Sequence, residues 1–320
     1  MLTVLLATRD GARTLPCVLE AFTRLRAPAT GWKLVIVDNG STDRTREIVA
    51  PFQSELPLIY KFEARLGKNF ALNAGLADLE GDLAVFTDDD VFPNPNWLVR
   101  LRAAADAQSS YSMFGGVILP RWEVSPPQWV GCLPRGPVFT LSDPLLSEGP
   151  TKPGNLFGPN MAIRSAIFKS GTSFDTSMGP RGADYPMGSE SELVERLGRQ
   201  GHKAWHIHDA VVEHFIRDYQ LKKSWVLRRA IRFGRGQVRL LRAAEPSTVQ
   251  SWLGVPPRVF LRMFKRGIRM AKALLSSNEQ ELLLARWEFN NLLGQVIEAR
   301  RLRSQRDVHG AGVQARPADH

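Results

Sequence analysis

Strand-like and helix-like segments alternate through the first half of this 320-residue chain, and their order restricts the folds that the chain can adopt. Each strand candidate is a short apolar run bounded by turn residues, and each helix candidate repeats its apolar residues at helical spacing. The predicted strands are residues 3–7, 33–37, 58–62 and 83–87, and the predicted helices are residues 14–25, 42–52, 69–79 and 95–107. This β-α-β-α order predicts an α/β fold with a mostly parallel central sheet and helices on both faces.

Three consecutive aspartates, Asp88 to Asp90, follow the last of these predicted strands. Ligands of parallel sheets bind where the strands end, so the aspartates are expected at a binding edge. Like charges beside an apolar strand are tolerated when a divalent cation neutralises them, and oxygen-rich clusters suit Mg²⁺ or Mn²⁺. A solvated acidic turn that caps the next helix explains an isolated triplet equally well, so the other motifs have to decide.

Other polar residues fall at the same predicted edge. Thr8 and Arg9 follow the first strand, and Asp38 ends the second. A carboxylate in that position can accept hydrogen bonds from a base or a ribose. Helix capping is a sufficient explanation for residues 41–43, but Asp38 precedes the cap. We therefore expect Thr8, Arg9 and Asp38 to contact a nucleotide.

Two cations, Arg65 and Lys68, flank Gly67 at the start of the predicted helix that contains Asn73. A helix N-terminus adds its own donors, so the segment is suited to a diphosphate, with Lys68 and Asn73 as contacts. The alternative is that these cations are simply solvated. The sequence contains no Gly-rich loop followed by Lys-Ser/Thr, which argues against a P-loop enzyme.

A later helix is predicted from Ser189 to Gln200, with residues 188–194 at its start and Gly201 at its end. Ser189 and Glu192 have the spacing of a capping box, which explains Glu192 structurally. Glu190 shares a helix face with apolar residues and is expected to point inward. An inward carboxylate must be paired, protonated or functional, and a general base is the functional interpretation. Favourable placement at the helix N-terminus is the structural alternative.

Three histidines follow this helix in short strand-like segments. His206 and His208 alternate on one strand face and are most simply structural. His214, at a strand end, is a candidate third contact to a metal or a phosphate. No zinc signature is complete.

The net charge of +10 is concentrated in the C-terminal third. Residues 217–306 contain 20 Lys/Arg and 6 Asp/Glu, net +14, which leaves 22 basic and 26 acidic residues elsewhere, net −4. Residues 258–275 combine a basic and an apolar face, the pattern of an interfacial membrane helix, and residues 228–242 carry a similar arginine stripe. The alternative is helices that pack their apolar faces on the rest of the protein. We expect an anionic membrane surface or a lipid-diphosphate acceptor as the partner.

The remaining features bear on location. Cys17 and Cys132 have no metal-like spacing and form no disulfide framework, which indicates a reducing compartment. The N-terminus resembles a first strand more than a signal peptide, and no apolar stretch is long enough to span a bilayer. We expect a cytoplasmic protein that is peripheral on the cytosolic face of the membrane.

In their order along the chain these motifs resemble glycosyltransferase family 2, the inverting nucleotide-sugar transferases with the A-type, Rossmann-like fold. The resemblance covers roughly residues 3–214 and rests on the segments Thr8-Arg9, Val37 to Asp43, Lys68-Asn69 with Asn73, Phe86 to Asp90, Gly158 to Ala162, Gly188 to Leu193 and Asp209 to Val212. With the charge pattern, it implies a nucleotide-sugar-binding catalytic domain at residues 1–216. A basic amphipathic helical region would follow at 217–306, and a disordered tail at 307–320.

The resemblance also implies roles for the nucleotide and metal residues. Asp38 would contact the uracil or ribose, and Lys68 would face the phosphates. Asp88 would lie near the ribose and the metal, and Asp90 would bind the metal, Mg²⁺ or Mn²⁺. Of the triplet, Asp89 is the residue expected to tolerate replacement.

For the transferred sugar, Asn160 lies in the segment that usually borders donor sugar and acceptor. The family typically has an aspartate as catalytic base where this chain has Glu190, and Glu192 occupies the next acidic position. The longer side chain keeps the chemistry but changes the geometry.

Together these expectations describe a metal-dependent, inverting glycosyltransferase that moves a sugar, with a UDP-sugar as the preferred donor, to an acceptor hydroxyl. The acceptor would be a sugar, a polysaccharide or a lipid-linked molecule, in polysaccharide or glycolipid synthesis. A metal-dependent phosphatase or nucleotidyltransferase would need an Asp pair or a Gly-rich loop on the first strand, and residues 8–11 supply neither. A nucleic-acid-binding protein led by its basic helices would leave the acidic cluster unexplained.

Overall fold

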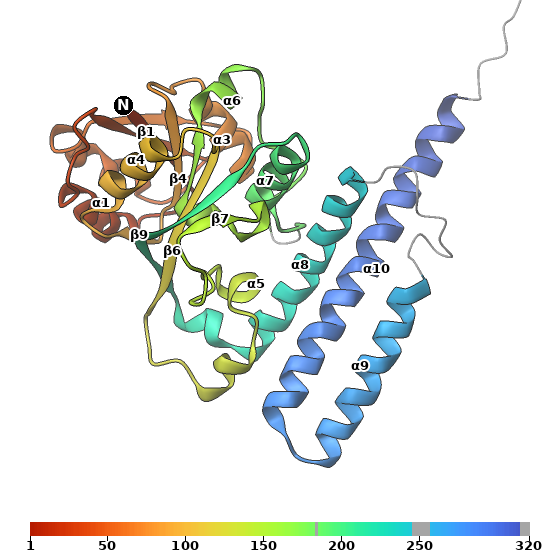
Figure 1. Ribbon diagram of the computed structural model, residues 1–320. Helices are drawn as coiled ribbons and strands as arrows, with labels where there is room; N and C mark the ends of the chain where they lie inside the picture. The colour runs from red at the N-terminus through yellow and green to blue at the C-terminus, as the bar shows by residue number, and fades with distance from the viewer. Residues whose placement is uncertain (183–184, 245–256, 314–320) are drawn as a thin grey trace, which may run out of the picture. The chain divides into compact units, whose positions relative to one another are not determined.

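The computed structural model describes residues 1–182, 185–244 and 257–313 (Figure 1). The chain forms two compact units. The sheet unit consists of Met1–Pro126 and Pro134–Asp218, and the helical unit consists of Pro127–Leu133 and the chain from Tyr219 onward.

One mixed sheet organises the sheet unit, in the order β3-β2-β1-β4-β8-β6-β9-β5, with β7 pairing with β9. The strands are β1 (Leu2–Thr8), β2 (Trp32–Asp38), β3 (Leu58–Phe62), β4 (Leu83–Asp88), β5 (Val91–Pro93), β6 (Met113–Trp122), β7 (Gly149–Thr151), β8 (Met161–Arg164) and β9 (Ala204–Ile216). The first four strands are parallel, as predicted. From the later part of the chain, β8 is antiparallel to both neighbours, whereas β6 and β9 are parallel.

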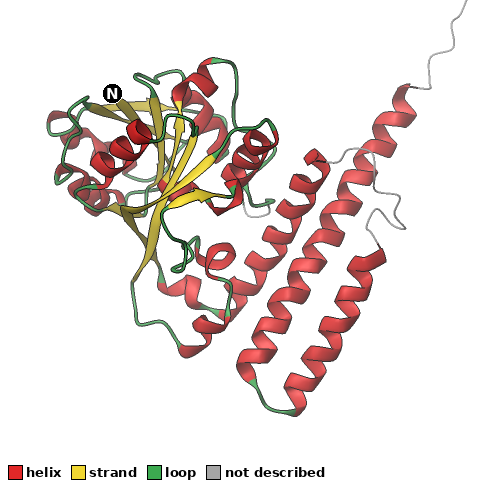
Figure 2. Cartoon of the chain, in the orientation of Figure 1, coloured by secondary structure: helices red, strands yellow, loops and turns green. Residues whose placement is uncertain are grey.

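Helices cover both faces of this sheet (Figure 2). They are α1 (Leu15–Thr23), α2 (Thr45–Val49), α3 (Lys68–Leu76), α4 (Trp97–Ala107), α5 (Arg135–Phe139), α6 (Ser165–Lys169) and α7 (Ser189–Arg199). Short 3-10 turns are η1 (Ala50–Ser54), η2 (Gln128–Cys132), η3 (Pro153–Asn155), η4 (Gly158–Asn160) and η5 (Asp218–Leu221).

The core explains why these segments fold as they do. β1, β2 and β4 are almost entirely buried apolar runs, as expected of parallel strands covered on both sides. Leu5 and Val35 belong to one cluster with Leu72 of α3 and Leu193 of α7. The helix predicted at residues 42–52 is divided, because α2 ends at Val49 and η1 follows it. Pro51 lies at the start of η1 and has no N–H to donate to the α-helical hydrogen-bond ladder.

The helical unit contains α8 (Lys223–Ala244), α9 (Pro257–Leu275) and α10 (Glu279–Val313). α8 and α10 approach closely at two glycines. A Cβ atom added to Gly234 would lie 1.9 Å from the carbonyl oxygen of Asn291, and one added to Gly294 would lie 2.1 Å from that of Ile231. Backbone therefore packs on backbone at both points.

Within the described residues, no helix is both long enough and apolar enough to cross a membrane. α10 continues past residue 306, where the sequence predicted a disordered tail, and ends at Val313. Residues 314–320 of that predicted tail lie outside the described residues.

Candidate functional site

The carboxyl ends of the parallel strands bring the predicted site residues to one edge of the sheet. Thr8 of β1 is in register with Asp38 of β2, and Ala7 is in register with Asp88 of β4. The Thr8 hydroxyl donates a hydrogen bond to Asp89 Oδ2 at 2.5 Å, which ties the end of β1 to the aspartate triplet. Asp89 thus has a hydrogen-bond partner at this edge, and its expected tolerance of replacement stays a prediction.

Asp38 is buried, and both of its carboxylate oxygens accept hydrogen bonds. The backbone amide of Ser41 donates to Oδ1 at 2.8 Å, and the Tyr60 hydroxyl donates to Oδ2 at 2.6 Å. Burial and the adjacent Asp38 carboxylate raise the pKa of Tyr60 above its ordinary value. The Asp38 carboxylate is therefore fixed at the strand end by these two hydrogen bonds.

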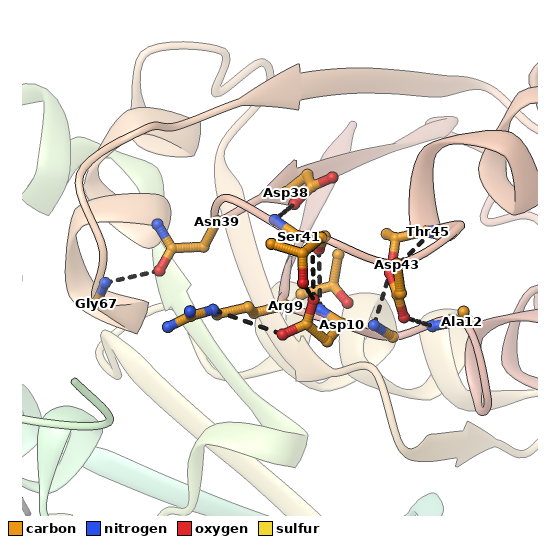
Figure 3. A network of polar contacts seen from close by, with 12 residues as sticks. Arg9, Asp10, Ala12, Asp38, Asn39, Ser41, Asp43, Thr45 and Gly67 are labelled. Carbon is orange, nitrogen blue, oxygen red and sulfur yellow. Dashed lines mark hydrogen bonds and ion pairs between the residues drawn. The ribbon is translucent and has the colours of Figure 1, made fainter. Parts of the chain in front are cut away.

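The loops after β1 and β2 are cross-linked by a polar network (Figure 3). Asp10 accepts hydrogen bonds from the Thr42 amide and hydroxyl, and its own amide donates to the Ser41 hydroxyl. The Arg9 guanidinium lies 3.7 Å from the Asp10 carboxylate and is partly exposed. The network places Arg9 at the edge beside Asp38.

Asn39 connects this network to the loop that carries Lys68. The Gly67 amide donates to Asn39 Oδ1 at 2.7 Å, and Asn39 Nδ2 donates to the carbonyls of Glu63 and Arg65 (Figure 3). Sequence reasoning assigned Asn39 no role. Its position directly after a strand-end aspartate was the available signal, since an amide can both donate to and accept from backbone groups.

Lys68, at the start of α3, forms ion pairs with both Asp88, the predicted nucleotide contact, and Glu190, the predicted base. Its Nζ lies 2.5 Å from Asp88 Oδ1 and 2.6 Å from Glu190 Oε1. Burial acts to lower the pKa of Lys68, but the two carboxylates outweigh it and raise that pKa. Burial, opposed by Lys68 and reinforced by Glu190, raises the pKa of Asp88. The predicted inward orientation of Glu190 agrees with this buried ion pair.

Asp90 has cationic partners of its own. His214 Nε2 lies 3.5 Å from Asp90 Oδ1, and a guanidinium nitrogen of Arg217 lies 3.1 Å from Oδ2. Burial opposes ionisation of Asp90, but His214 and Arg217 outweigh it and lower the pKa of the carboxyl. Burial likewise acts to lower the pKa of His214, but the facing Asp90 carboxylate raises it. Burial, followed by the neighbouring Asp90 charge, raises the pKa of Asp89 to about 7. Arg217 was not identified from the sequence.

The orientation of the His214 ring suits a divalent cation beside Asp90. His214 Nδ1 lies 2.7 Å from the carbonyl oxygen of Phe139, and because a carbonyl only accepts, this nitrogen carries the hydrogen. Nε2 is then the nitrogen that faces Asp90, the orientation that metal-ligating histidines commonly have. In the described part of the chain, however, no three His, Cys, Asp or Glu side chains are grouped as a metal-binding cluster. Asp90 and His214 are thus the two facing donors that a divalent cation could use at this place.

Asn160, which the sequence predicted beside a sugar, lies in a network of buried hydrogen bonds. Its side chain is completely buried, with Oδ1 accepting from Trp97 Nε1 at 2.8 Å and Nδ2 donating to the carbonyls of Val117 and Ala210. The pairing of β6 with β9 shifts register between Gly116 and Val117, and the Asn160 amide satisfies carbonyls at this irregularity. These contacts give Asn160 a structural role, and its predicted sugar contact stays a prediction.

Glu192 also differs from its prediction. The residue before α7 is Gly188, with φ of 107°, and no side chain caps the helix, so the predicted capping box is absent. Ser189 donates instead to the side-chain oxygen of Asn69. Glu192 is buried and pairs with Arg196 at 2.8 Å, one turn along the helix. This ion pair gives Glu192 a structural explanation, and its predicted sugar contact stays a prediction.

Asn73 has a structural explanation as well. Its Nδ2 donates to the Phe174 carbonyl at 2.9 Å, and its Oδ1 accepts from the Phe174 amide at 2.8 Å. The side chain thereby fastens α3 to a segment about 100 residues away along the chain. The diphosphate contact expected of Asn73 stays a prediction.

The chain is similar in sequence to two proteins over most of its length. Glycosyltransferase AglE of Haloferax volcanii is 23% identical over 243 residues, which cover 74% of this chain and 73% of that protein. The succinoglycan biosynthesis protein ExoM of Rhizobium meliloti is 22% identical over 222 residues, which cover 69% of this chain and 68% of that protein.

Solved structures share the fold. The mannosyltransferase PcManGT from Pyrobaculum calidifontis, in complex with GDP-Man and Mn²⁺, has a TM-score of 0.60 at 19% identity, covering 96% of this chain and 87% of that one. S. aureus TarS residues 1–349, in complex with UDP-GlcNAc, has a TM-score of 0.53 at 14% identity, covering 95% of this chain and 92% of that one. The family model described as glycosyl transferase family 2 matches residues 3–168, more than half of the sequence. The chain therefore belongs to glycosyltransferase family 2 and has its A-type, α/β fold.

Proposed function

We propose that this glycosyltransferase transfers a sugar from a UDP-sugar to an acceptor hydroxyl in a single displacement that inverts the anomeric centre. The observation that carries the proposal is the buried bridge from Asp88 through Lys68 to Glu190. It connects the strand end expected to hold the nucleotide with the carboxylate expected to act as base. Family membership favours sugar transfer over phosphatase, nucleotidyltransferase and nucleic-acid-binding activities.

The nucleotide would lie along the edge formed by the ends of β1, β2 and β4. Asp38, fixed by Ser41 and Tyr60, would contact the base or ribose, with Thr8 and Arg9 beside it. Asp88 would lie near the ribose, and Lys68 would face the phosphates. An ammonium at the first residue of a helix is suited to a diphosphate, because the positive end of the helix dipole adds to its charge.

Asp88, Asp90 and His214 would hold Mg²⁺ or Mn²⁺, with the diphosphate completing the coordination. Support comes from the facing Asp90 carboxylate and His214 Nε2, and from the Mn²⁺ present with PcManGT. When bound, the cation would neutralise negative charge on the departing diphosphate. Arg217, 3.1 Å from Asp90, would add a fixed positive charge at the same place.

Glu190 would take the proton from the acceptor hydroxyl as its oxygen bonds to the anomeric carbon and the bond to the diphosphate breaks. Its side chain is 16% exposed, so it is largely shielded from water yet accessible to an acceptor. Lys68 would orient it, since the ion pair fixes one carboxylate oxygen and leaves the other to face the hydroxyl.

The acceptor would be a sugar, a growing polysaccharide or a lipid-linked sugar, in polysaccharide or glycolipid synthesis. The relative ExoM is named for succinoglycan biosynthesis. The concentration of positive charge in residues 217–306 supports work at the cytosolic face of an anionic membrane.

The experiment is a screen of UDP- and GDP-sugars for Mn²⁺-dependent turnover, because TarS was solved with UDP-GlcNAc and PcManGT with GDP-Man. Asp90→Ala should lose the Mn²⁺ dependence of nucleotide binding. Glu190→Gln should bind UDP within about twofold of the parent protein but lose transfer by about 10²- to 10⁴-fold. Glu195→Gln, the same change on the same helix, is the matched control and should retain activity. Turnover retained in Glu190→Gln would refute its assignment as base, and a guanosine preference would refute the proposed donor.

A further inference from the structure

One face of α9 presents large apolar side chains to solvent. Leu261 is 56% exposed, Phe264 67%, Ile268 44% and Leu275 89%. Their spacing of three, four and seven residues puts them on one side of the helix. We call these four residues the outer stripe.

The outer stripe is not the face by which α9 packs in its own unit. Val259 and Ala273 of α9 are buried, and Phe260 and Met263 pack against the cluster that includes Leu292 of α10. At 3.6 residues per turn, Val259 and Ala273 fall on the side opposite the outer stripe. A helix at a protein surface normally has polar residues on that opposite side. Folding of the helical unit therefore leaves the outer stripe unexplained.

The cations of α9 fall into two groups, one paired with α10 and one exposed. Arg269 pairs with Glu281 and Glu288 of α10, and Arg266 also pairs with Glu288. Four further cations lie along one flank of the outer stripe and are exposed: Arg258, Arg262, Lys265 and Lys272. Among the described residues no carboxylate forms an ion pair with these four, and the sequence of α9 contains no Asp or Glu. The flank is thus uniformly positive beside an apolar strip.

We propose that α9 lies in the plane of an anionic lipid bilayer, with the outer stripe inserted among the acyl chains and the basic flank on the headgroups. Interfacial helices have this combination of apolar residues and cations. Nineteen helical residues span about 28 Å, enough for several lipid headgroups along the surface. The charge of the flank matches the headgroups of anionic lipid, and the outer stripe matches the apolar interior of the bilayer.

Vesicle sedimentation with the full chain tests this surface independently of transfer activity. Binding should be strong to vesicles with anionic lipid and weak to neutral ones. Phe264→Gln with Ile268→Gln should weaken binding to anionic vesicles about 10- to 100-fold, because two apolar side chains no longer insert. Lys265→Gln with Lys272→Gln should weaken it about 20- to 30-fold, at about fivefold for each cation. Glutamine keeps the helical propensity, and circular dichroism would verify folding.

Two controls separate this surface from general effects. Arg300→Gln with Arg301→Gln removes the same charge from exposed positions of α10 and should change binding less than about threefold. Leu145, 88% exposed in the sheet unit, is matched to Leu275, so Leu145→Gln should be silent where Leu275→Gln weakens binding. Equal binding to neutral and anionic vesicles would overturn the proposal. So would concentration-dependent dimerisation that Phe264→Gln abolishes without any vesicle binding, because the outer stripe would then be a contact between copies of this chain.

Discussion

Replacement of Asn160 by alanine tests the structural role that its burial assigns. The change removes three hydrogen bonds at once, to Trp97 Nε1 and to the carbonyls of Val117 and Ala210. Each buried group left without a partner costs about 1–3 kcal/mol, so the upper bound for three is about 9 kcal/mol. A water molecule that enters the vacated space would restore part of this, and we expect a loss of about 3–5 kcal/mol.

Urea denaturation followed by tryptophan fluorescence would measure this loss as a shift of the midpoint at unchanged slope. The matched control is Asn155→Ala, because Asn155 is exposed and its side-chain amide donates a hydrogen bond to the Thr151 hydroxyl. That change should alter the free energy of unfolding by about 0.5 kcal/mol or less. A loss below about 1 kcal/mol for Asn160→Ala would refute the hydrogen-bond argument. Unchanged stability with weakened binding of the donor sugar would support the sugar contact that the sequence predicted.

Two further predictions concern the helical unit. Gly294→Ala should destabilise this unit by about 2 kcal/mol or more in thermal melts, because the new Cβ meets the Ile231 carbonyl. The control is Gly267→Ala in α9, which has open space around it and should be neutral or slightly stabilising. Equal effects of the two changes would refute the close crossing of α8 and α10. Burial opposes ionisation of Glu298, but hydrogen bonds from Arg235 and Arg239 lower its pKa, so the stability it contributes is present above its ordinary value of 4.5 and is lost as the pH falls through the lowered pKa. Glu298→Gln should therefore lower the melting temperature at pH 7, by the equivalent of about 3 kcal/mol, and the difference from the parent protein should shrink below about pH 4; a difference independent of pH would contradict this.

The parallel half of the sheet and its binding edge were predictable because their signals are local. Apolar runs identified β1, β2, β3 and β4, and the register of parallel strands places Asp38 and Asp88 together. The later strands were harder. The sequence suggested two short strands where the structure has one long strand, β9, and its pairing with β6 joins segments distant along the chain. Hydrophobic periodicity carries no information on such pairings.

The structural roles of the site residues were harder to predict for the same reason. Asn160 was chosen because its segment borders donor sugar and acceptor in the family, but its hydrogen-bond partners are 43 to 63 residues away in the sequence. Ser189 and Glu192 have capping-box spacing, yet Gly188 is the residue before the helix and Ser189 is already its first residue. Lys68 and Glu190 were both identified, but only the fold shows that one ammonium joins Glu190 to Asp88.

The pairing of β6 with β9 sets an order of events during synthesis. Met113 of β6 is in register with Ala204 of β9, so β6 leaves the ribosome about 90 residues before this neighbour exists. At about 5–20 residues per second, the wait lasts roughly 5–20 seconds, whereas β1, β2, β3 and β4 can pair as soon as each strand emerges. During that interval one edge of β6 is open to pairing with other chains. Docking of β8 covers only the opposite edge of β6, so the edge that pairs with β9 stays open until residues 204–216 have been made.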